Sequence, residues 1–560
     1  MYPSGFHTYL SFCFASSFGR LRKAIRQKQM GFVRVLLKKE PGAYLRTMKQ
    51  KDPAIPIIAL TAMQLLFYFY SAYISESPRY GFNQLRHMAP ETLLGILTVF
   101  AGLLLLLRKS GRQLPGNDPV PWKRAVLYSI GVAFPALVIF LLLSNGFVND
   151  DGLVHTFNLL CGEFRATLDE MLSCSVIRSI WLAFGDPVRF NPFDVYSVYS
   201  SGMGFVFVLV TVLFACREMG RQWPFFVLLM VSGGFMQAFF GDVENYAGVM
   251  ALCMAYIWAS REYLEDRLSI VTPGLLLALA VSMHLMALCL MPAHLLLWIR
   301  AWRMKARRDA VLSIVAMITA LLFVFIIAAD NGLNLRDLQN SHLLGSGVDR
   351  TTIDMLARPS LTYYNAVTGV LFLLFPFWWV PLVLIFTGNL KNDGFNRFLG
   401  AASLGFLAMA YGWRLGLGPY FDWNLVAAAA IPPSVLAFRN LLLLRRSGTA
   451  TFAVYFLAFT GCIHSYAWIT SNHMVFSMPR MEAMQEIVQY RNGSGCVIPE
   501  ELRSLQGFPE QGENSPAKGI KAGRYSPTPA SDGGLRCATS PWDPSRAWRS
   551  EKKFRECPHP

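Results

Sequence analysis

The sequence predicts an all-α protein, a polytopic bundle of about 12 to 13 transmembrane helices. Three observations carry this prediction. Apolar residues make up 54% of the 560 positions, charged residues make up only 15%, and the mean hydropathy is +0.37. Soluble domains carry about 25% charged residues. Apolar segments of about 17 to 22 residues, long enough to cross a bilayer, recur along the chain.

The expected membrane-spanning segments follow one another closely, with short polar stretches between them. Each is bounded by charged or turn-forming residues, and each is long enough for roughly 30 Å of hydrocarbon. They begin near residues 54, 91, 124, 197, 223, 244, 270, 309, 366, 397, 424 and 450.

Residues 271–300 form an apolar stretch that is too long for one span. His284 and Pro292 interrupt it, and proline inside a helix removes a backbone hydrogen bond. We therefore expect two short or broken helices here rather than one.

Basic residues gather in alternate loops, which indicates the topology of the chain. Residues 1–53 hold eleven Lys or Arg against two acids, and residues 300–309 hold five against one. Residues 145–196 hold three basic and seven acidic residues. The positive-inside rule places the first kind of loop in the cytoplasm and the second kind across the membrane. The formal charge of +16 therefore reflects topology, and no nucleic-acid partner is expected.

This topology divides the chain into three parts. Residues 1–53 are expected to form a basic amphipathic segment on the anionic inner leaflet. Residues 54–470 form the membrane domain, and residues 471–560 form a polar tail. The tail is rich in Pro, Gly and Ser from about residue 505, so that part is expected to be disordered. The predicted outer loops of the membrane domain are 145–196, 330–364 and 411–423.

The first large outer loop contains a segment with helical periodicity from about residue 155 to 182. Apolar and charged residues alternate in it as they do in a helix that lies along the membrane interface. An ordinary surface helix fits the same pattern. Cys161 and Cys174 fall in this segment, and a disulfide between them would require a break in the helix.

Polar clusters converge on the predicted outer face. Asp242 and Glu244 stand in "GDVENY" between two apolar segments, where an unpaired carboxylate is costly. Four further clusters fall on the same side, at residues 149–155, 283–284, 337–354 and 411–424. Each has a simpler reading alone: solvated loop acids, a packing histidine, a local pair of Arg414 with Asp422, or an interfacial aromatic at Trp423. Their shared side favours a common site.

Four of these stretches resemble the glycosyltransferase C superfamily of polytopic membrane proteins. They are an outer loop that opens with Asp-Gly, the "GDVENY" element, a helix break at a histidine, and "YFDWNLVAAAAIP". The resemblance covers about residues 120–470. It implies transfer of a sugar from a polyprenyl-phosphate carrier to a glycan, lipid or protein acceptor, outside the bacterial inner membrane. The acidic positions of the superfamily match Asp150 and Asp151 in the first large outer loop, and Glu244 after a later span.

The chain departs from the superfamily pattern in one respect. The acidic loop commonly follows the first span, whereas here it follows the third expected span. Because Asp150 and Asp151 are adjacent, the sequence leaves open which of them acts, and Asp151 is favoured by its position beside Gly152.

The chemistry of glycosyl transfer assigns roles to these residues. A carboxylate, Asp150 or Asp151, would take the proton of the acceptor hydroxyl. An arginine, Arg350 or Arg414, would bind the leaving phosphate. Alternatively a divalent cation, Mg or Mn, held by Asp151 and Glu244 would neutralise that phosphate. The remaining candidates for substrate binding are Tyr246, His284, Asp422 and Trp423.

Other classes of site are not indicated. The cysteines and histidines lack zinc spacing, and no GxxxxGK[ST] loop occurs. A transporter or lipid flippase is the main alternative, because such proteins are also polytopic and bind ligands at broken helices. A third alternative is a non-catalytic scaffold subunit.

Overall fold

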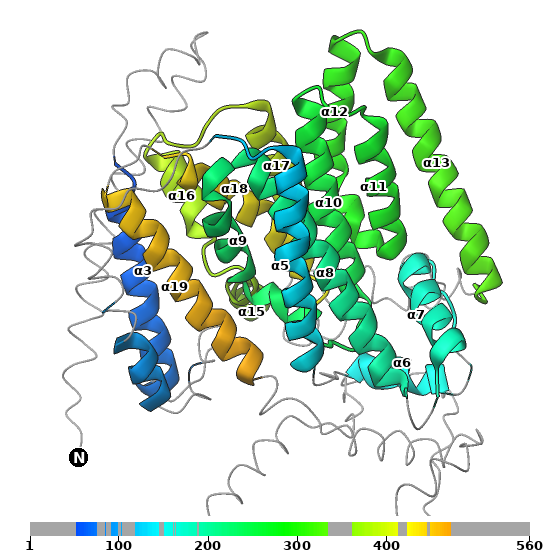
Figure 1. Ribbon diagram of the computed structural model, residues 1–560, viewed down its shortest axis with the longest axis horizontal. Coiled ribbons are helices and arrows are strands. Elements are labelled where there is room, and N and C mark those ends of the chain that lie inside the picture. Colours follow the sequence, from blue (N-terminus) through cyan, green and yellow to red (C-terminus); the bar gives the residue numbers. More distant parts are fainter. Residues whose placement is uncertain are drawn as a thin grey trace, which may run out of the picture. The chain divides into compact units, whose positions relative to one another are not determined.

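The computed structural model describes the helical part of the chain (Figure 1). Apart from one isolated bridge between Asp186 and Phe190, these residues contain helices and their connections, and no strand is found among them. The protein is therefore all-α across the part of the chain that is described. The described residues are 52–74, 85, 91–98, 102, 118–144, 150–160, 162, 164–186, 190–333, 361–412, 423–444 and 448–471.

Short 3-10 or π segments separate several of the α-helices. The named elements in chain order are α3 (Ala54–Phe69), η1 (Tyr70–Ile74), α5 (Trp122–Leu142), α6 (Asp150–Leu160), α7 (Met171–Phe184), α8 (Pro192–Glu218), η3 (Gly220–Gln222), α9 (Trp223–Val231), η4 (Gly234–Phe239), α10 (Tyr246–Leu264), α11 (Val271–Met283), η5 (Leu285–Leu290), α12 (Met291–Arg303), α13 (Arg307–Asp330), α15 (Leu361–Leu374), α16 (Trp379–Phe386), α17 (Gly394–Gly412), η7 (Ala427–Ala430), α18 (Ile431–Leu442) and α19 (Gly448–Ser471).

Six helical segments are long and apolar enough to cross a membrane by length and composition. A seventh span is obtained if α15 and α16, which are bent by 87° at their junction, are counted together. The chain is a multi-pass integral membrane protein. The six segments are Ala54–Tyr73, Trp122–Leu142, Pro192–Glu218, Leu285–Arg303, Arg307–Asp330 and Gly448–Thr470.

Most of the expected span positions fall on or directly before helices, but the span expected from residue 91 lies largely outside the described residues, and several of the other helices are short. Those that begin at residues 223, 271 and 431 have 9, 13 and 12 residues. At 1.5 Å per residue they cover roughly 13 to 20 Å, less than the roughly 30 Å hydrocarbon layer. The break at His284 is confirmed, because α11 ends there and η5 follows. Pro292 lies in the first turn of α12, where proline is tolerated, so it begins a helix.

The long helix α8 is the centre of the bundle. In α8, 67% of the most apolar stretch is buried inside the protein, compared with 22% in α5 and 17% in α13. The helices α5, α9 and α10 pack on α8, and α13 packs on α11 (Figure 1). The outward faces of α5 and α13 carry exposed Leu, Ile, Val and Phe side chains. Soluble proteins rarely expose apolar surface of this extent, so these faces fit a lipid environment.

The first and last described long helices, α3 and α19, lie side by side (Figure 1). Polar contacts join this pair to α16. The indole Nε1 of Trp379 donates to Oε1 of Gln64 at 2.9 Å, and Nε2 of Gln64 donates to the hydroxyl of Tyr68 at 2.6 Å. The ring of Tyr68 stacks on that of His464. Hydrogen bonds between helices contribute to association inside a membrane, where apolar packing alone gives no solvent-driven gain.

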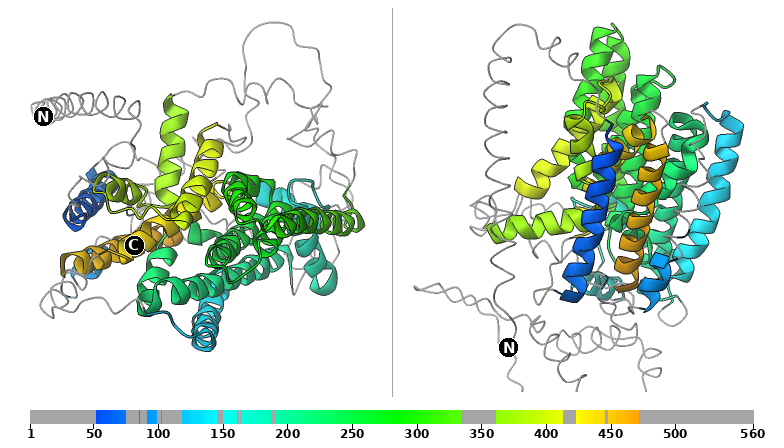
Figure 2. Two further views of the ribbon diagram at one scale, coloured as in Figure 1. Left: turned by 90° about the horizontal axis from the view of Figure 1, so that it is seen from above. Right: turned by 90° about the vertical axis from the view of Figure 1, so that its left-hand side faces the viewer.

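Near this pair, α15 lies across the direction of the long helices (Figure 2). Its C-terminal end meets α19, where Nε2 of His464 lies 2.6 Å from the carbonyl oxygen of Leu373. Gly234 permits this approach, because a Cβ there would lie 2.1 Å from the same oxygen.

The segment expected as one amphipathic helix from about 155 to 182 folds as two helices. After α6 ends at Leu160, the chain crosses residues 161–170 before α7 begins at Met171. Cys174 is free and buried, and Cys161 lies outside the described residues. The terminal parts expected at 1–53 and 471–560 lie outside the described residues, apart from positions 52, 53 and 471.

Candidate functional site

Two acidic motifs that are far apart in the sequence meet at their backbones. An ideal Cβ placed on Gly152 would lie 2.7 Å from the carbonyl oxygen of Val243, so the two main chains touch where only glycine fits. Asp151 precedes this glycine and Glu244 follows this valine. The start of α6 therefore lies against the "GDVENY" segment. The side chains of Asp150 and Asp151 lie outside the described part of α6.

Glu170 is the centre of a buried hydrogen-bonded group beside this contact. Glu170 is 8% exposed, and its Oε2 accepts a hydrogen bond from Nδ2 of Asn245 at 2.7 Å. Its Oε1 lies 3.6 Å from Nε2 of His284. Three separate segments thus deliver a carboxylate, an amide and an imidazole to one place.

The backbone fixes the orientation of the imidazole. His284 stands between α11 and η5, and its Nδ1 accepts a hydrogen bond from the backbone N–H of Met286 at 3.0 Å. The neutral ring therefore carries its proton on Nε2, the nitrogen that faces Glu170. The backbone N–H of Leu285 donates to the carbonyl oxygen of Asp169 at 2.9 Å, which ties the break in the helix to the residue before Glu170.

Hydroxyl groups fasten the same region from the other side. Ser173 Oγ lies 3.0 Å from the carbonyl oxygen of Met283 and 3.2 Å from that of Asn245. The hydroxyl of Tyr199 lies 3.0 Å from Ser173 Oγ. Gly248 makes room for this tyrosine, because a Cβ there would lie 2.4 Å from the hydroxyl oxygen. These contacts join α7, α8, α10 and α11.

Asp242 is buried without a hydrogen-bond partner among the described residues. It is 1% exposed, and neither carboxylate oxygen is paired there. Burial raises the pKa of Asp242 well above its usual range, because the charged form loses its hydration. Buried polar groups are nearly always satisfied, so an unpaired carboxylate is a common mark of a functional position.

Glu244 and the α6 residue His155 also approach this group. Glu244 is 4% exposed, and both it and Glu170 lie within electrostatic range of the Tyr196 hydroxyl. The ring of His155 lies 6.4 Å from that of Tyr196. Burial lowers the pKa of His155 to about 4, and the Asp169 carboxylate opposes this shift. We call Glu170, Asp242, Glu244, Asn245 and His284 the outer cluster, after the side of the membrane that the sequence predicts for them.

The structure brings together part of the site that the sequence predicts. Glu244 and His284 belong to the outer cluster, and the ring of Tyr246 lies 5.0 Å from that of His284. Trp423 is buried against Trp468, with ring centroids 5.7 Å apart, as a packing residue would be. The remaining candidates, Arg350, Arg414 and Asp422, lie outside the described residues.

Sequence reasoning missed Glu170 and Asn245. Glu170 fell inside the segment read as one amphipathic helix, where an acid is expected on the solvated face. The signal available was the pair Asp169 and Glu170 directly before the apolar stretch that forms α7. Asn245 stands inside the "GDVENY" motif, but the functional interpretation of that motif rested on its two acids, Asp242 and Glu244.

The described residues contain no group of three or more His, Cys, Asp or Glu side chains that could hold a metal ion. The expected divalent cation at Asp151 and Glu244 depends in part on a side chain outside that description. A divalent cation at this site stays a prediction.

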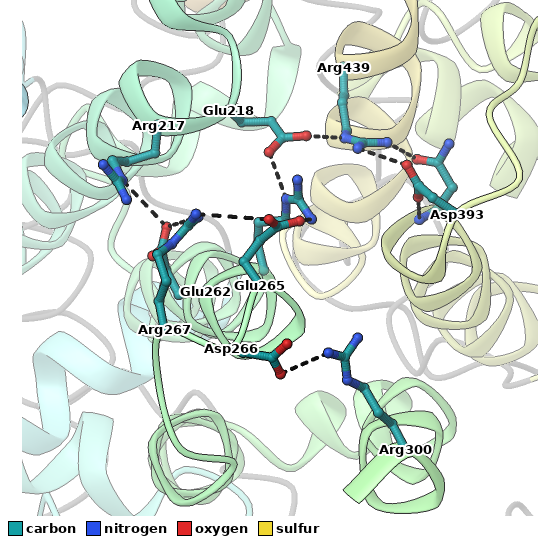
Figure 3. A network of polar contacts seen from close by, with 11 residues as sticks. Arg217, Glu218, Glu262, Glu265, Asp266, Arg267, Arg300, Asp393 and Arg439 are labelled. Carbon is teal, nitrogen blue, oxygen red and sulfur yellow. Dashed lines mark hydrogen bonds and ion pairs between the residues drawn. The ribbon is translucent and has the colours of Figure 1, made fainter. Parts of the chain in front are cut away.

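A second polar network lies at the other end of α10 (Figure 3). Glu218 accepts hydrogen bonds from Nε of Arg261 and Nε of Arg439, each at 2.6 Å. Arg439 also contacts Asp393 at 2.9 Å. The guanidinium groups of Arg261 and Arg439 each lie 5.3 Å from the centre of the Phe395 ring. We call this the inner network; its ion-paired members are Arg217, Glu218, Arg261, Glu262, Glu265, Arg267, Asp393 and Arg439.

The two polar regions differ in their pairing. In the inner network four arginines meet four carboxylates, so the charges balance. In the outer cluster the groups are acidic apart from His284 and Asn245, and Asp242 has no partner among the described residues. The inner network fits a structural clamp, whereas the outer cluster fits a site that receives a polar ligand.

Comparisons with known proteins add no family assignment: no family model, curated protein or solved structure matches this chain.

Proposed function

We propose that the protein is an integral-membrane glycosyltransferase of the glycosyltransferase C type, which uses a polyprenyl-phosphate-linked sugar donor on the outer side of the bacterial inner membrane. The observation that carries the proposal is the Glu170–Asn245–His284 group, which lies buried beside the contact between the two acidic motifs. It combines a carboxylate with an amide donor at 2.7 Å and an imidazole nitrogen at 3.6 Å.

Glu170 is the carboxylate best placed to act as the general base. The Nδ2 of Asn245 and the Nε2 of His284 both face it, and both favour the ionised form. His284 acts as a positioning residue, because its Nδ1 is occupied by the Met286 N–H and its Nε2 proton faces Glu170. Asp150, Asp151 and Glu244 would then serve to bind the donor, its phosphate or a bound cation.

A lipid-linked donor suits the architecture. Within the part of the chain that the structure describes, the connections expected on the inner side are short, and none forms a separate nucleotide-binding domain. A donor that arrives within the bilayer needs no such domain. The leaving phosphate would be neutralised by Arg350 or Arg414, or by a divalent cation held by Asp151 and Glu244.

The test is transfer of radiolabelled sugar from polyprenyl phosphate in vesicles that contain the purified protein. Glu170→Gln should lower the rate by about 10² to 10⁴, the usual contribution of a general base. Asp309→Asn makes a matched carboxyl-to-amide change on the exposed first turn of α13, and it should leave the rate unchanged. Equal rates for both variants would remove Glu170 from the mechanism.

His284→Asn separates positioning from folding. The asparagine Oδ1 can replace Nδ1 as the acceptor for the Met286 N–H, while the contact to Glu170 is lost. The acidic limb of the pH–rate profile should move to higher pH, because the carboxylate loses a donor that favours its charged form. An unchanged profile would assign His284 a purely structural role.

EDTA distinguishes the two ways of neutralising the phosphate. Loss of transfer with EDTA and its recovery with Mg or Mn supports the cation, whereas full activity in EDTA leaves the role to the arginines.

A transporter or lipid flippase is the second candidate, and the short helices α9, α11 and α18 favour it. Interrupted helices line the ligand sites of many transporters. The charge-balanced inner network opposes it, because alternating access requires the inner end to open. Movement of a fluorescent polyprenyl phosphate across vesicles, without sugar transfer from any donor, would select this candidate.

A further inference from the structure

Two helices end in the same way, with a charged residue in the left-handed conformation. At the end of α10 the N–H of Arg267 donates to the carbonyl oxygen of Glu262, and Asp266 has φ 56°. At the end of α12 the N–H of Ala306 donates to the carbonyl oxygen of Ala301, and Lys305 has φ 61°. This is the Schellman arrangement, in which glycine is the usual left-handed residue.

A charged side chain at such a position costs stability, because its Cβ crowds the backbone. At Asp266 an ion pair offsets this strain, because Oδ1 of Asp266 accepts a hydrogen bond from Nη2 of Arg300 at 2.9 Å. Lys305 forms no ion pair with any described residue. A strained residue with no internal partner points to a role outside the fold.

The turn around Lys305 combines positive charge with exposed apolar surface. Arg303, Lys305, Arg307 and Arg308 are all exposed and lie within six positions. Trp302 and Met304 are each 55% exposed, and the guanidinium of Arg307 lies 5.1 Å from the centre of the Trp302 ring. The apolar faces of α12 and α13 continue away from the turn on the lipid side.

We propose that the α12–α13 turn, residues 302–308, binds the headgroup of an anionic phospholipid in the inner leaflet. The cations would contact the phosphate, Trp302 would lie at the headgroup level, and the acyl chains would lie along the exposed sides of α12 and α13. This proposal is independent of the proposed glycosyl transfer.

Topology alone does not explain the lysine. The positive-inside rule accounts for Arg303, Arg307 and Arg308, which occupy helical positions without strain. It is met equally well with glycine at 305. The lysine adds a fourth cation at the one position of the turn where a side chain is unfavourable.

The test is the thermal shift of the purified full-length protein in neutral detergent on adding phosphatidylglycerol or phosphatidylcholine. Phosphatidylglycerol should raise the melting temperature of the wild type, and phosphatidylcholine should not. Lys305→Gly should raise the melting temperature without lipid, because it relieves the left-handed strain, and should lose half or more of the phosphatidylglycerol shift. These two effects have opposite signs, so a loss of fold cannot imitate them.

Asp266→Gly is the matched control at the other Schellman turn, and its phosphatidylglycerol shift should equal that of the wild type. Inorganic phosphate at the same concentration should give no shift. An undiminished shift in Lys305→Gly, or equal shifts from phosphatidylcholine or inorganic phosphate, would overturn the proposal.

Discussion

Gly152 lies against the carbonyl oxygen of Val243 so closely that a Cβ at position 152 would come within 2.7 Å of it. This contact joins the start of α6 to the segment that contains Asp242, Glu244 and Asn245. A backbone oxygen cannot move aside as the end of a side chain can, so the contact fixes the distance between the two acidic motifs.

Gly152→Ala should therefore destabilise the protein by about 1 to 3 kcal/mol, the usual cost of overpacking. It should also lower the sugar transfer proposed above, because α6 would be displaced from the outer cluster. Gly131→Ala is the control, since its Cβ would meet nothing within 4 Å and it lies in α5. Thermal unfolding in detergent measures both variants. Equal melting temperatures would mean that the contact between Gly152 and Val243 does not contribute to stability.

Glu218→Gln should be strongly destabilising. Glu218 pairs with Arg261 and Arg439, and the side chains of Glu218 and Arg439 are 7% and 4% exposed. Removing one partner from a buried ion pair costs about 3 to 5 kcal/mol, because the remaining charge is left uncompensated.

The control for Glu218→Gln is Asp266→Asn, whose side chain is 62% exposed in its pair with Arg300. Exposed pairs contribute at most about 1 kcal/mol. The melting temperature should fall clearly in Glu218→Gln and little in Asp266→Asn. Similar small losses in both variants would contradict a clamping role for the inner network.

Asp242→Asn tests the protonation of the unpaired carboxyl. Burial raises the pKa of Asp242 in the folded protein. As the pH rises above about 4, the unfolded chain releases this proton while the folded protein retains it, so the folded state loses stability. The amide resembles the protonated acid and does not titrate. The melting temperature of the variant relative to the wild type should therefore increase from pH 5 to pH 8. A difference that stays constant with pH would show that Asp242 is ionised or paired in the folded protein.

His155→Phe tests the opposite case. Burial lowers the pKa of His155 to about 4, whereas the unfolded value is about 6.5. Between these values the unfolded chain binds a proton that the folded protein refuses, so stability is lost as the pH falls from 6.5 to 4. Phenylalanine keeps a ring next to Phe164 and Tyr196 and does not titrate. The variant should lose less stability than the wild type over that interval, as measured by unfolding at each pH. Identical pH dependence would mean that His155 is hydrated in the folded state.

The helical membrane architecture could be predicted from the sequence, because the lengths of the apolar segments can be read directly along the chain. The break at His284 was predictable for the same reason, since residues 271–300 exceed the length of one span. The lengths of α9, α11 and α18 were less accessible. Where each helix stops depends on tertiary contacts, such as the hydrogen bond from Leu285 N–H to the Asp169 carbonyl oxygen.

The candidate site was predicted only in part. Glu244 and His284 were visible as polar residues in apolar surroundings, and that cost can be read from the sequence. Glu170 was not, because its surroundings in the chain are polar and its burial arises from Asn245 and His284, which lie 75 and 114 positions away. The inner network was hidden for a related reason: its arginines satisfy the positive-inside rule and need no further explanation until their partners are known.

The pair of Glu218 and Arg439 joins residues 221 positions apart. Chains are synthesised from the N-terminus, so Glu218 and Arg261 enter the membrane long before Arg439 exists. During that interval Glu218 has one arginine instead of two, and the Phe395 ring has not yet arrived. The arrival of α17 and α18 completes the set, so the ion pairs at this end of the bundle form late in biogenesis.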